Sequence, residues 1–369
     1  MVEATDVHLP RSSLKAMTDQ PRKPFGETFE PRDQPLTEPQ IVPGMPSSGD
    51  GEPMTEDGLR LRRYDRPREV PAPITPLLDH EMIRHGEVES AVAGSALSDG
   101  ARHRLRGLRA VGAPAMFAGG GVGIDYGSLL KTAARPEYLA AHIREASAYL
   151  HAERVNLLIV PGMSGYPVGS MYSIVSGIPA VLLKKQKHTA GTSPERAAGS
   201  DPDSAAPRYP AGSFVIPSYT GDGDVVMSAD LDAFQNTIDD ILRLQLDAQE
   251  DAEEPDLLVR VAGADDIIDK ATMSQAVSES ALVVGKVAIE RFIARHRART
   301  GDQRRFRDDV QVVAWVTPLI KGYNRPHEHM RRWFGITPFA GLNVTSVHLD
   351  PPAIGIDGLG IVGFAAGRP

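Results

Sequence analysis

Residues 256–276 read DLLVRVAGADDIIDKATMSQA, and this stretch decides how the rest of the chain is interpreted. It begins as a short apolar strand at 257–264 and continues with three carboxylates, Asp265, Asp266 and Asp269. A turn of small and polar residues follows and opens a long helix. A strand, an acidic pair, a turn and a helix in this order are typical of a site at the carboxyl edge of a parallel sheet.

The two parts of this stretch suit different groups of one ligand. The turn at 270–274 presents backbone N–H groups at a helix N-terminus, where a phosphate group binds well. The carboxylates of Asp265 and Asp266 can accept hydrogen bonds from sugar hydroxyls or face a hydrated divalent metal ion. The stretch therefore predicts a site for a phosphorylated sugar.

The run DDIID at 265–269, followed by KATM, resembles the phosphoribosyl pyrophosphate (PRPP) loop of type I phosphoribosyltransferases, and the hypoxanthine-guanine branch most closely. The resemblance implies that Asp265 and Asp266 bind the ribose hydroxyls and Mg²⁺, and that Asp269 lies near the base as a general base. It also implies that the 5′-phosphate is bound by the turn Lys270, Ala271, Thr272, Met273 and Ser274. This turn is a degenerate version of the loop, because it is about one residue shorter and lacks the glycine that normally permits close backbone approach.

A βαβ unit precedes this stretch. It consists of a buried strand at 155–160, a glycine-bearing loop at 161–166, a helix at about 167–176 and a strand from 178. Such a loop presents N–H groups toward an anion. The resemblance implies that pyrophosphate is bound by Gly162, Met163, Ser164 and Gly165, together with Lys184 and Lys185 after the second strand. A solvated loop is the alternative for the two lysines.

Three segments lie between this unit and the central stretch. Residues 190–212 are low in complexity and are expected to form a mobile loop. A β-hairpin follows, and Ser218 and Tyr219 match the flexible loop that covers PRPP in the resembling family. The amphipathic helix expected at 230–250 is an insertion relative to that family, and an oligomer surface is one role for it.

The segment after the strand at 310–316 supplies the base pocket in the resembling family. The candidates for base binding here are Lys321, Tyr323, Trp333 and Phe334, with Phe339 also available. The alternative is that most of these aromatic residues belong to the core. His327 and His329 could bind a metal ion with a third ligand such as His348 or Asp350, but an exposed loop is the favoured interpretation.

Composition limits the class of protein. A net charge of −8 argues against general nucleic-acid binding, and the absence of cysteine excludes disulfides and cysteine-based zinc sites. No apolar run approaches the roughly 20 residues of a membrane span, and a cytoplasmic location is expected. Residues 1–75 are rich in proline and are expected to be disordered or to form an extended arm on a partner subunit.

Together these features predict an α/β fold: a type I phosphoribosyltransferase-like parallel sheet flanked by helices at 76–320. A C-terminal segment at 321–369 is expected to form a hood or part of the substrate pocket. The resemblance implies Mg²⁺-dependent transfer of 5-phosphoribosyl from PRPP to a purine-like base in a homodimer or higher oligomer. The alternatives are a PRPP-binding regulatory protein without activity and a ribosyltransferase of specialised metabolism with an unusual acceptor.

Overall fold

The computed structural model describes residues 54–55, 61–64, 82–116, 122–130, 135–187, 208–209, 212–217 and 224–364. Most of the arm expected at 1–75 and most of the mobile loop expected at 190–212 lie outside these residues, as do Ser218 and Tyr219. No helix in the described ranges is long and apolar enough to cross a membrane.

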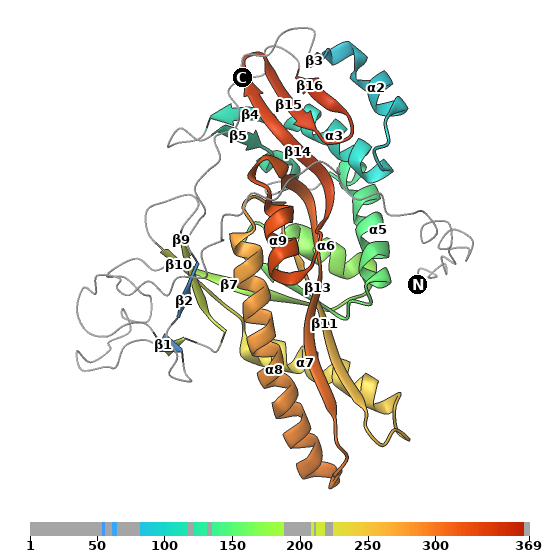
Figure 1. Ribbon diagram of the computed structural model, residues 1–369, viewed down its shortest axis with the longest axis vertical. Coiled ribbons are helices and arrows are strands. Elements are labelled where there is room, and N and C mark those ends of the chain that lie inside the picture. The colour runs from blue at the N-terminus through green and yellow to red at the C-terminus, as the bar shows by residue number, and fades with distance from the viewer. Residues whose placement is uncertain are drawn as a thin grey trace, which may run out of the picture. The chain divides into compact units, whose positions relative to one another are not determined.

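A mostly parallel sheet forms the centre of the described chain (Figure 1). Its five parallel strands lie in the order β7 (Ala180–Lys187), β6 (Leu157–Pro161), β11 (Asp256–Ala264), β13 (Arg307–Lys321) and β14 (Phe339–Leu349). Counted along the chain, this is the doubly wound order 2-1-3-4-5, which reverses direction between β6 and β11. The α/β class expected from the sequence is thereby confirmed.

Shorter strands extend the sheet on both sides. Beyond β7 lie β10 (Asp224–Ser228), β9 (Phe214–Pro217) and β2 (Arg62–Arg63). Beyond β14 lie β15 (Pro352–Ile356), β16 (Gly360–Gly363) and β3 (Met82–Ile83). β9 and β10 form the antiparallel hairpin predicted from the sequence.

Helices cover both faces of the central strands. The two faces are visible in β6, where Leu157 and Ile159 pack into one core while Leu158 and Val160 pack into the other. The first core contains α7 (Leu231–Asp247) and α8 (Thr272–Thr300), and Figure 1 shows α8 running alongside β13. The second contains α3 (Asp99–Val111), α5 (Pro136–Ala152) and α6 (Tyr166–Ser176).

The remaining elements are short. They are β1 (Met54–Thr55), paired with β8 (Arg208–Tyr209); the hairpin β4 (Ala113–Met116) and β5 (Val122–Asp125); β12 (Ile267–Ile268) beside β13; the helices α2 (Val88–Gly94), α4 (Gly127–Leu130) and α9 (Pro326–Phe334); and the 3-10 turns η2 (His85–Glu87) and η4 (Gly322–Asn324).

Helix α7 does not serve as an oligomer surface through its apolar stripe, as one interpretation of the sequence held. The stripe is buried within this chain, where it packs with β11 and α8 in the first core: Phe234, Ile238, Ile241, Leu242 and Leu246. The helix begins where the Asp230 side chain accepts a hydrogen bond from the Ala233 N–H. It is the connection that returns the chain from the hairpin to β11.

The segment 321–369 was expected to form a hood or part of the substrate pocket. Its described part continues the main sheet, because β14 pairs in parallel with β13, and β15 and β16 pair antiparallel to it in turn. His327 and His329 lie in helix α9 and are partly buried, so the expectation of an exposed loop is wrong. The described residues contain no group of three or more His, Cys, Asp or Glu side chains placed to hold a metal ion.

Candidate functional site

Two loops meet where the strand order reverses. The loop after β6 brings Gly165 against Asp265, which directly follows β11: a Cβ atom added at Gly165 would lie 2.9 Å from Asp265 Oδ1 and 2.8 Å from the Pro161 carbonyl oxygen. Only glycine permits this approach of backbone to carboxylate. In an open α/β sheet this crevice, outside the carboxyl ends of the strands, is where ligands bind.

The loop after β6 is also held against β7. The Tyr166 hydroxyl donates a hydrogen bond to the Leu183 carbonyl oxygen. A Cβ atom at Gly162 would lie 2.6 Å from that same oxygen, so a second glycine is required here. The peptide bond between Gly162 and Met163 is cis. The four residues predicted to bind pyrophosphate span this loop, and Gly165 is the one that lies against Asp265.

Asp265 and Asp266 form the buried floor of the site, with 9% and 1% of their surface exposed. The Asp266 N–H donates to Asp265 Oδ1 at 2.8 Å, and the buried Tyr126 hydroxyl donates to Asp266 Oδ2 at 3.1 Å. The Asp265 N–H is bonded to the Val316 carbonyl oxygen of β13, which fixes the backbone of the pair. Carboxylate oxygens held in this way can accept further hydrogen bonds from ligand hydroxyls.

Strand β12 explains why Asp269 separates from the pair. Ile267 and Ile268 pair with Leu319 and Ile320 of β13, so the next residue, Asp269, lies beside the end of that strand. There Asp269 Oδ2 accepts from Lys321 Nζ at 3.0 Å, and Oδ1 accepts from the Asn324 amide. The predicted general base and a predicted base-binding lysine are thus in direct contact, and both carboxylate oxygens are engaged.

The turn after Asp269 adopts the backbone that a glycine would adopt. Ala271 has φ 61° and ψ 5°, in the left-handed region, and is buried. Helix α8 then begins at Thr272. Its first turn offers backbone N–H groups that have no acceptor within the helix. The Thr272 hydroxyl is buried with no hydrogen-bond partner among the described residues, and Ser274 is buried beside it in the chain.

Lys184 and Lys185, predicted to bind pyrophosphate, lie within strand β7. Lys184 pairs with Asp230 through Nζ and Oδ2 at 2.7 Å, and this hydrogen bond raises the pKa of the lysine and lowers that of the aspartate. Its side chain is 61% exposed. Lys185 lies on β7 opposite Met227, and its side chain is outside the described part of the chain.

The aromatic candidates are dispersed. Trp333 packs on the first core with its ring edge-on to His329, and Tyr323 packs on the second core. Phe334 is partly buried at the end of α9. Phe339 is partly buried and stacks between His142 and Tyr149 on the second core. Among the base-binding candidates, Lys321 alone contacts another predicted site residue in the hydrogen bonds and ion pairs of the described residues.

Two residues of the site were missed from the sequence. Tyr126 lies 140 positions before its partner Asp266, and nothing in the spacing connects them. Asn324 lies in the turn after β13, three residues beyond the predicted Lys321, and its place in that post-strand loop is a signal that could have identified it.

No protein-family model and no curated protein matches the chain. Among solved structures, the chain is similar to adenine phosphoribosyltransferase from Trypanosoma brucei in complex with AMP, pyrophosphate and ribose-5-phosphate, at 12% identity over 65% of this chain and 78% of that one, with a TM-score of 0.35. It is also similar to adenine phosphoribosyltransferase from Leishmania donovani, at 14% identity over 67% and 82%, with a TM-score of 0.33. For orotate phosphoribosyltransferase from Aeropyrum pernix the values are 12% over 68% and 95%, with a TM-score of 0.31. At these values the similarity assigns neither a family nor an activity to this chain.

Proposed function

We propose that this protein transfers a 5-phosphoribosyl group from PRPP to a ring nitrogen of a purine-like base and releases pyrophosphate. The observation that carries the proposal is the contact between the 162–165 loop and Asp265 at the point where the strand order reverses. This contact sets an anion-binding backbone loop directly beside an acidic pair. A ligand that carries a diphosphate and vicinal hydroxyls on one small ring fits both parts.

Each part of the ligand has a matching part of the site. The ribose hydroxyls donate to the buried carboxylates of Asp265 and Asp266, and the 5′-phosphate accepts from the N–H groups of the first turn of α8 and from the Thr272 hydroxyl. The leaving pyrophosphate accepts from the loop at 162–165. Hydrogen bonds to the departing oxygens strengthen as negative charge develops there, so this loop contributes most to the rate.

The acidic pair also fits Mg²⁺. This ion retains several waters and is usually held by one or two carboxylates together with substrate phosphates, so Asp265 and Asp266 would be sufficient protein ligands. When bound, the ion would neutralise charge on the pyrophosphate. The Asp266 carboxylate is held in place by Tyr126, which keeps it oriented toward that side of the sheet.

The proton of the attacking nitrogen is assigned to Asp269. Its carboxylate is hydrogen-bonded to Lys321 and Asn324, so a base ring that displaces one of these donors would meet the free oxygen. The displaced Lys321 ammonium could then donate to an exocyclic oxygen of the same base. Asp269 and Lys321 therefore act as a pair in this proposal.

The test is an assay for pyrophosphate with PRPP, Mg²⁺ and a panel of nucleobases and related heterocycles. We expect release with at least one base, and we expect Asp266→Asn to abolish it while Asp240→Asn, an exposed carboxylate on α7, leaves it unchanged. If PRPP binds and no acceptor yields pyrophosphate, the protein is a PRPP-binding regulator. The strained Ala271 in the phosphate turn is the observation that favours this second candidate. If PRPP does not bind, both are refuted.

A further inference from the structure

The Arg104 side chain is fully buried without a counter-ion. It belongs to helix α3 and has 0% of its surface exposed. All three guanidinium nitrogens, Nε, Nη1 and Nη2, lack a hydrogen-bond partner among the described residues. A guanidinium carries five N–H donors and is protonated at neutral pH, and burial lowers the pKa of Arg104 only to about 10. An isolated buried cation of this kind is strongly destabilising.

The groups around Arg104 are polar but neutral. Tyr172 of α6 and His142 of α5 are both fully buried, and His142 Nε2 is 2.7 Å from the Tyr172 hydroxyl oxygen. The other imidazole nitrogen, Nδ1, has no partner in the described chain. Burial, together with the Arg104 charge, lowers the pKa of His142 to about 3, so the imidazole is uncharged at neutral pH. The cluster thus carries one net positive charge.

The carboxylates near this cluster are already engaged. Glu145, one turn beyond His142, accepts hydrogen bonds from the Ser98 hydroxyl and the Gly100 N–H, and so caps the start of α3. Asp265 Oδ1 accepts from the Asp266 N–H. The ion pairs within the described residues include none to Arg104. The missing negative charge must come from outside this part of the chain.

We propose that Arg104, His142 and Tyr172 form a binding site for a small oxyanion, a carboxylate or a phosphate, between helices α3, α5 and α6. A guanidinium binds either group through two parallel hydrogen bonds, and the phenol or the imidazole adds a further donor. Tyr172 interacts electrostatically with both Arg104 and Asp265. The site is independent of the proposed transferase activity.

Thermal unfolding of the full chain tests the proposal. The wild-type protein is compared with Arg104→Met, a variant that keeps the length of the side chain and removes its charge. Both are measured in chloride buffer alone and after addition of acetate or inorganic phosphate at equal ionic strength. Without added oxyanion we expect Arg104→Met to unfold at a higher temperature than wild type, because a buried unpaired charge has been removed. Acetate or phosphate should then raise the unfolding temperature of wild type and not that of the variant.

The matched control is Arg106→Met on the same helix, which removes an equal charge from an exposed ion pair with Glu89. It should respond to both anions as wild type does. The anion whose effect depends on Arg104 shows whether the ligand is a carboxylate or a phosphate. The Kd of that anion should rise by about tenfold or more in Arg104→Lys, because a lysine ammonium cannot form the two parallel hydrogen bonds of a guanidinium. The proposal is overturned if neither anion stabilises wild type, or if wild type and Arg104→Met gain equally. The first of these outcomes does not depend on the variant folding.

Discussion

At the scale of single residues, Ala271 shows the conformational free energy that a turn without glycine requires. A left-handed backbone at a non-glycine residue is unfavourable by about 1–2 kcal/mol, and Ala271 at φ 61° keeps it only because the residues on both sides are fixed by β12 and α8. The sequence showed that glycine was absent from the turn. It could not show that the turn nevertheless keeps the geometry glycine would give.

Ala271→Gly should therefore stabilise the protein. Relief of the strain exceeds the added entropy of the unfolded chain, and we expect a gain of about 0.5–1 kcal/mol in the free energy of unfolding, measured by denaturant titration. Ala276→Gly, in the interior of the same helix, is the control and should destabilise by about 1 kcal/mol or more. A loss of stability in Ala271→Gly similar to that of Ala276→Gly would show that the left-handed turn is not under strain.

A substitution at Asp269 should distinguish a role in turnover from a role in PRPP binding. Asp269→Asn removes the carboxylate that contacts Lys321 but leaves Asp265, Asp266 and the phosphate turn in place. We expect PRPP to bind with unchanged Kd while turnover falls by about 10²-fold or more, the usual contribution of a general base. Isothermal titration gives the first quantity and pyrophosphate release the second. An unchanged kcat in this variant would remove Asp269 from the proton transfer.

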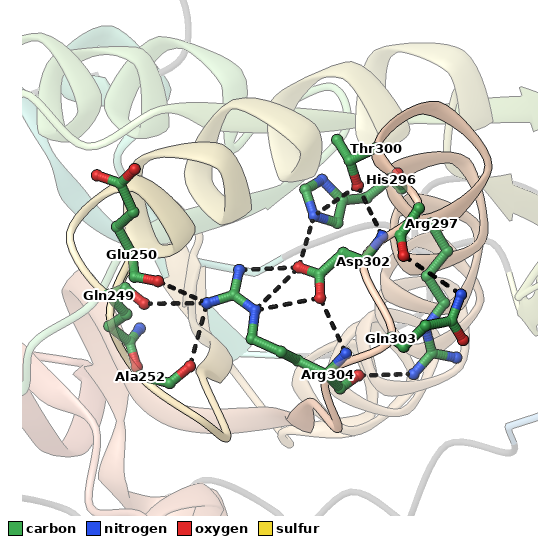
Figure 2. Close-up of polar contacts among 10 residues, drawn as sticks. Gln249, Glu250, Ala252, His296, Arg297, Thr300, Asp302, Gln303 and Arg304 are labelled. Carbon is green, nitrogen blue, oxygen red and sulfur yellow. Dashed lines mark hydrogen bonds and ion pairs between the residues drawn. The ribbon is translucent and has the colours of Figure 1, made fainter.

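At the scale of elements, the far ends of α7 and α8 are held together by one arginine (Figure 2). Arg304, after α8, donates to the Glu250 and Ala252 carbonyl oxygens after α7 at 2.8 and 3.1 Å. It also pairs with Asp302 at 2.8 Å, and Asp302 in turn lies 3.1 Å from His296 Nε2. The clamp satisfies carbonyl groups of the loop that follows α7.

This clamp should make stability depend on acid pH. Hydrogen bonds from Arg304 hold the pKa of the Asp302 carboxyl below its ordinary value of 3.8. A depressed folded-state pKa stabilises the protein above the unfolded pKa, and this contribution is lost as the pH falls toward the folded value. The difference in unfolding free energy between wild type and Asp302→Asn should thus be constant near neutral pH and shrink below about pH 4.

Urea titrations at several pH values measure this difference. Asp308→Asn, an exposed carboxylate on β13, is the control and should show a smaller difference from wild type that changes less with pH. If the difference for Asp302→Asn stays the same from pH 7 to pH 3, the carboxylate charge is not what holds the clamp.

The strands predicted from the sequence are those that contain a mainly apolar run. β6, β7 and β11 each contain one, and all three are present near the expected positions, as is helix α8 after the acidic stretch. The strands of the 339–363 segment were missed because glycines and prolines interrupt their alternation. The role of α7 was misjudged because an apolar stripe looks the same whether it packs on its own sheet or on another subunit. The Tyr126–Asp266 hydrogen bond depends on tertiary folding, which no local pattern encodes.

At the scale of the whole molecule, a strand from the N-terminal part of the chain reaches the helix that begins at the site. β2 pairs in parallel with β9, and the next residue, Tyr64, is 4% exposed with its ring edge-on to Phe214 at 5.7 Å between centroids. The Tyr64 hydroxyl donates to Glu279 Oε2 of α8 at 2.6 Å. Burial raises the pKa of the phenol, so it remains a donor. The part of the expected arm that is described packs on its own chain.

This contact predicts a graded loss of stability when the Tyr64 side chain is shortened in two steps. Tyr64→Phe removes only the hydrogen bond to a charged group and should cost about 1–2 kcal/mol, while Tyr64→Ala also leaves a cavity beside Phe214 and should cost about 3–4 kcal/mol. Arg62, which pairs with the same carboxylate but is 63% exposed, is the control: Arg62→Met should change stability by less than about 1 kcal/mol.

Hydrogen exchange shows where the structure loosens, because undocking of β2 exposes the edge of β9 first. Tyr64→Ala should speed exchange at the β9 amides and leave those of β11 protected. If both variants match wild type in stability and exchange, β2 is not docked in solution, and the N-terminal part of the chain contributes nothing to the position of α8.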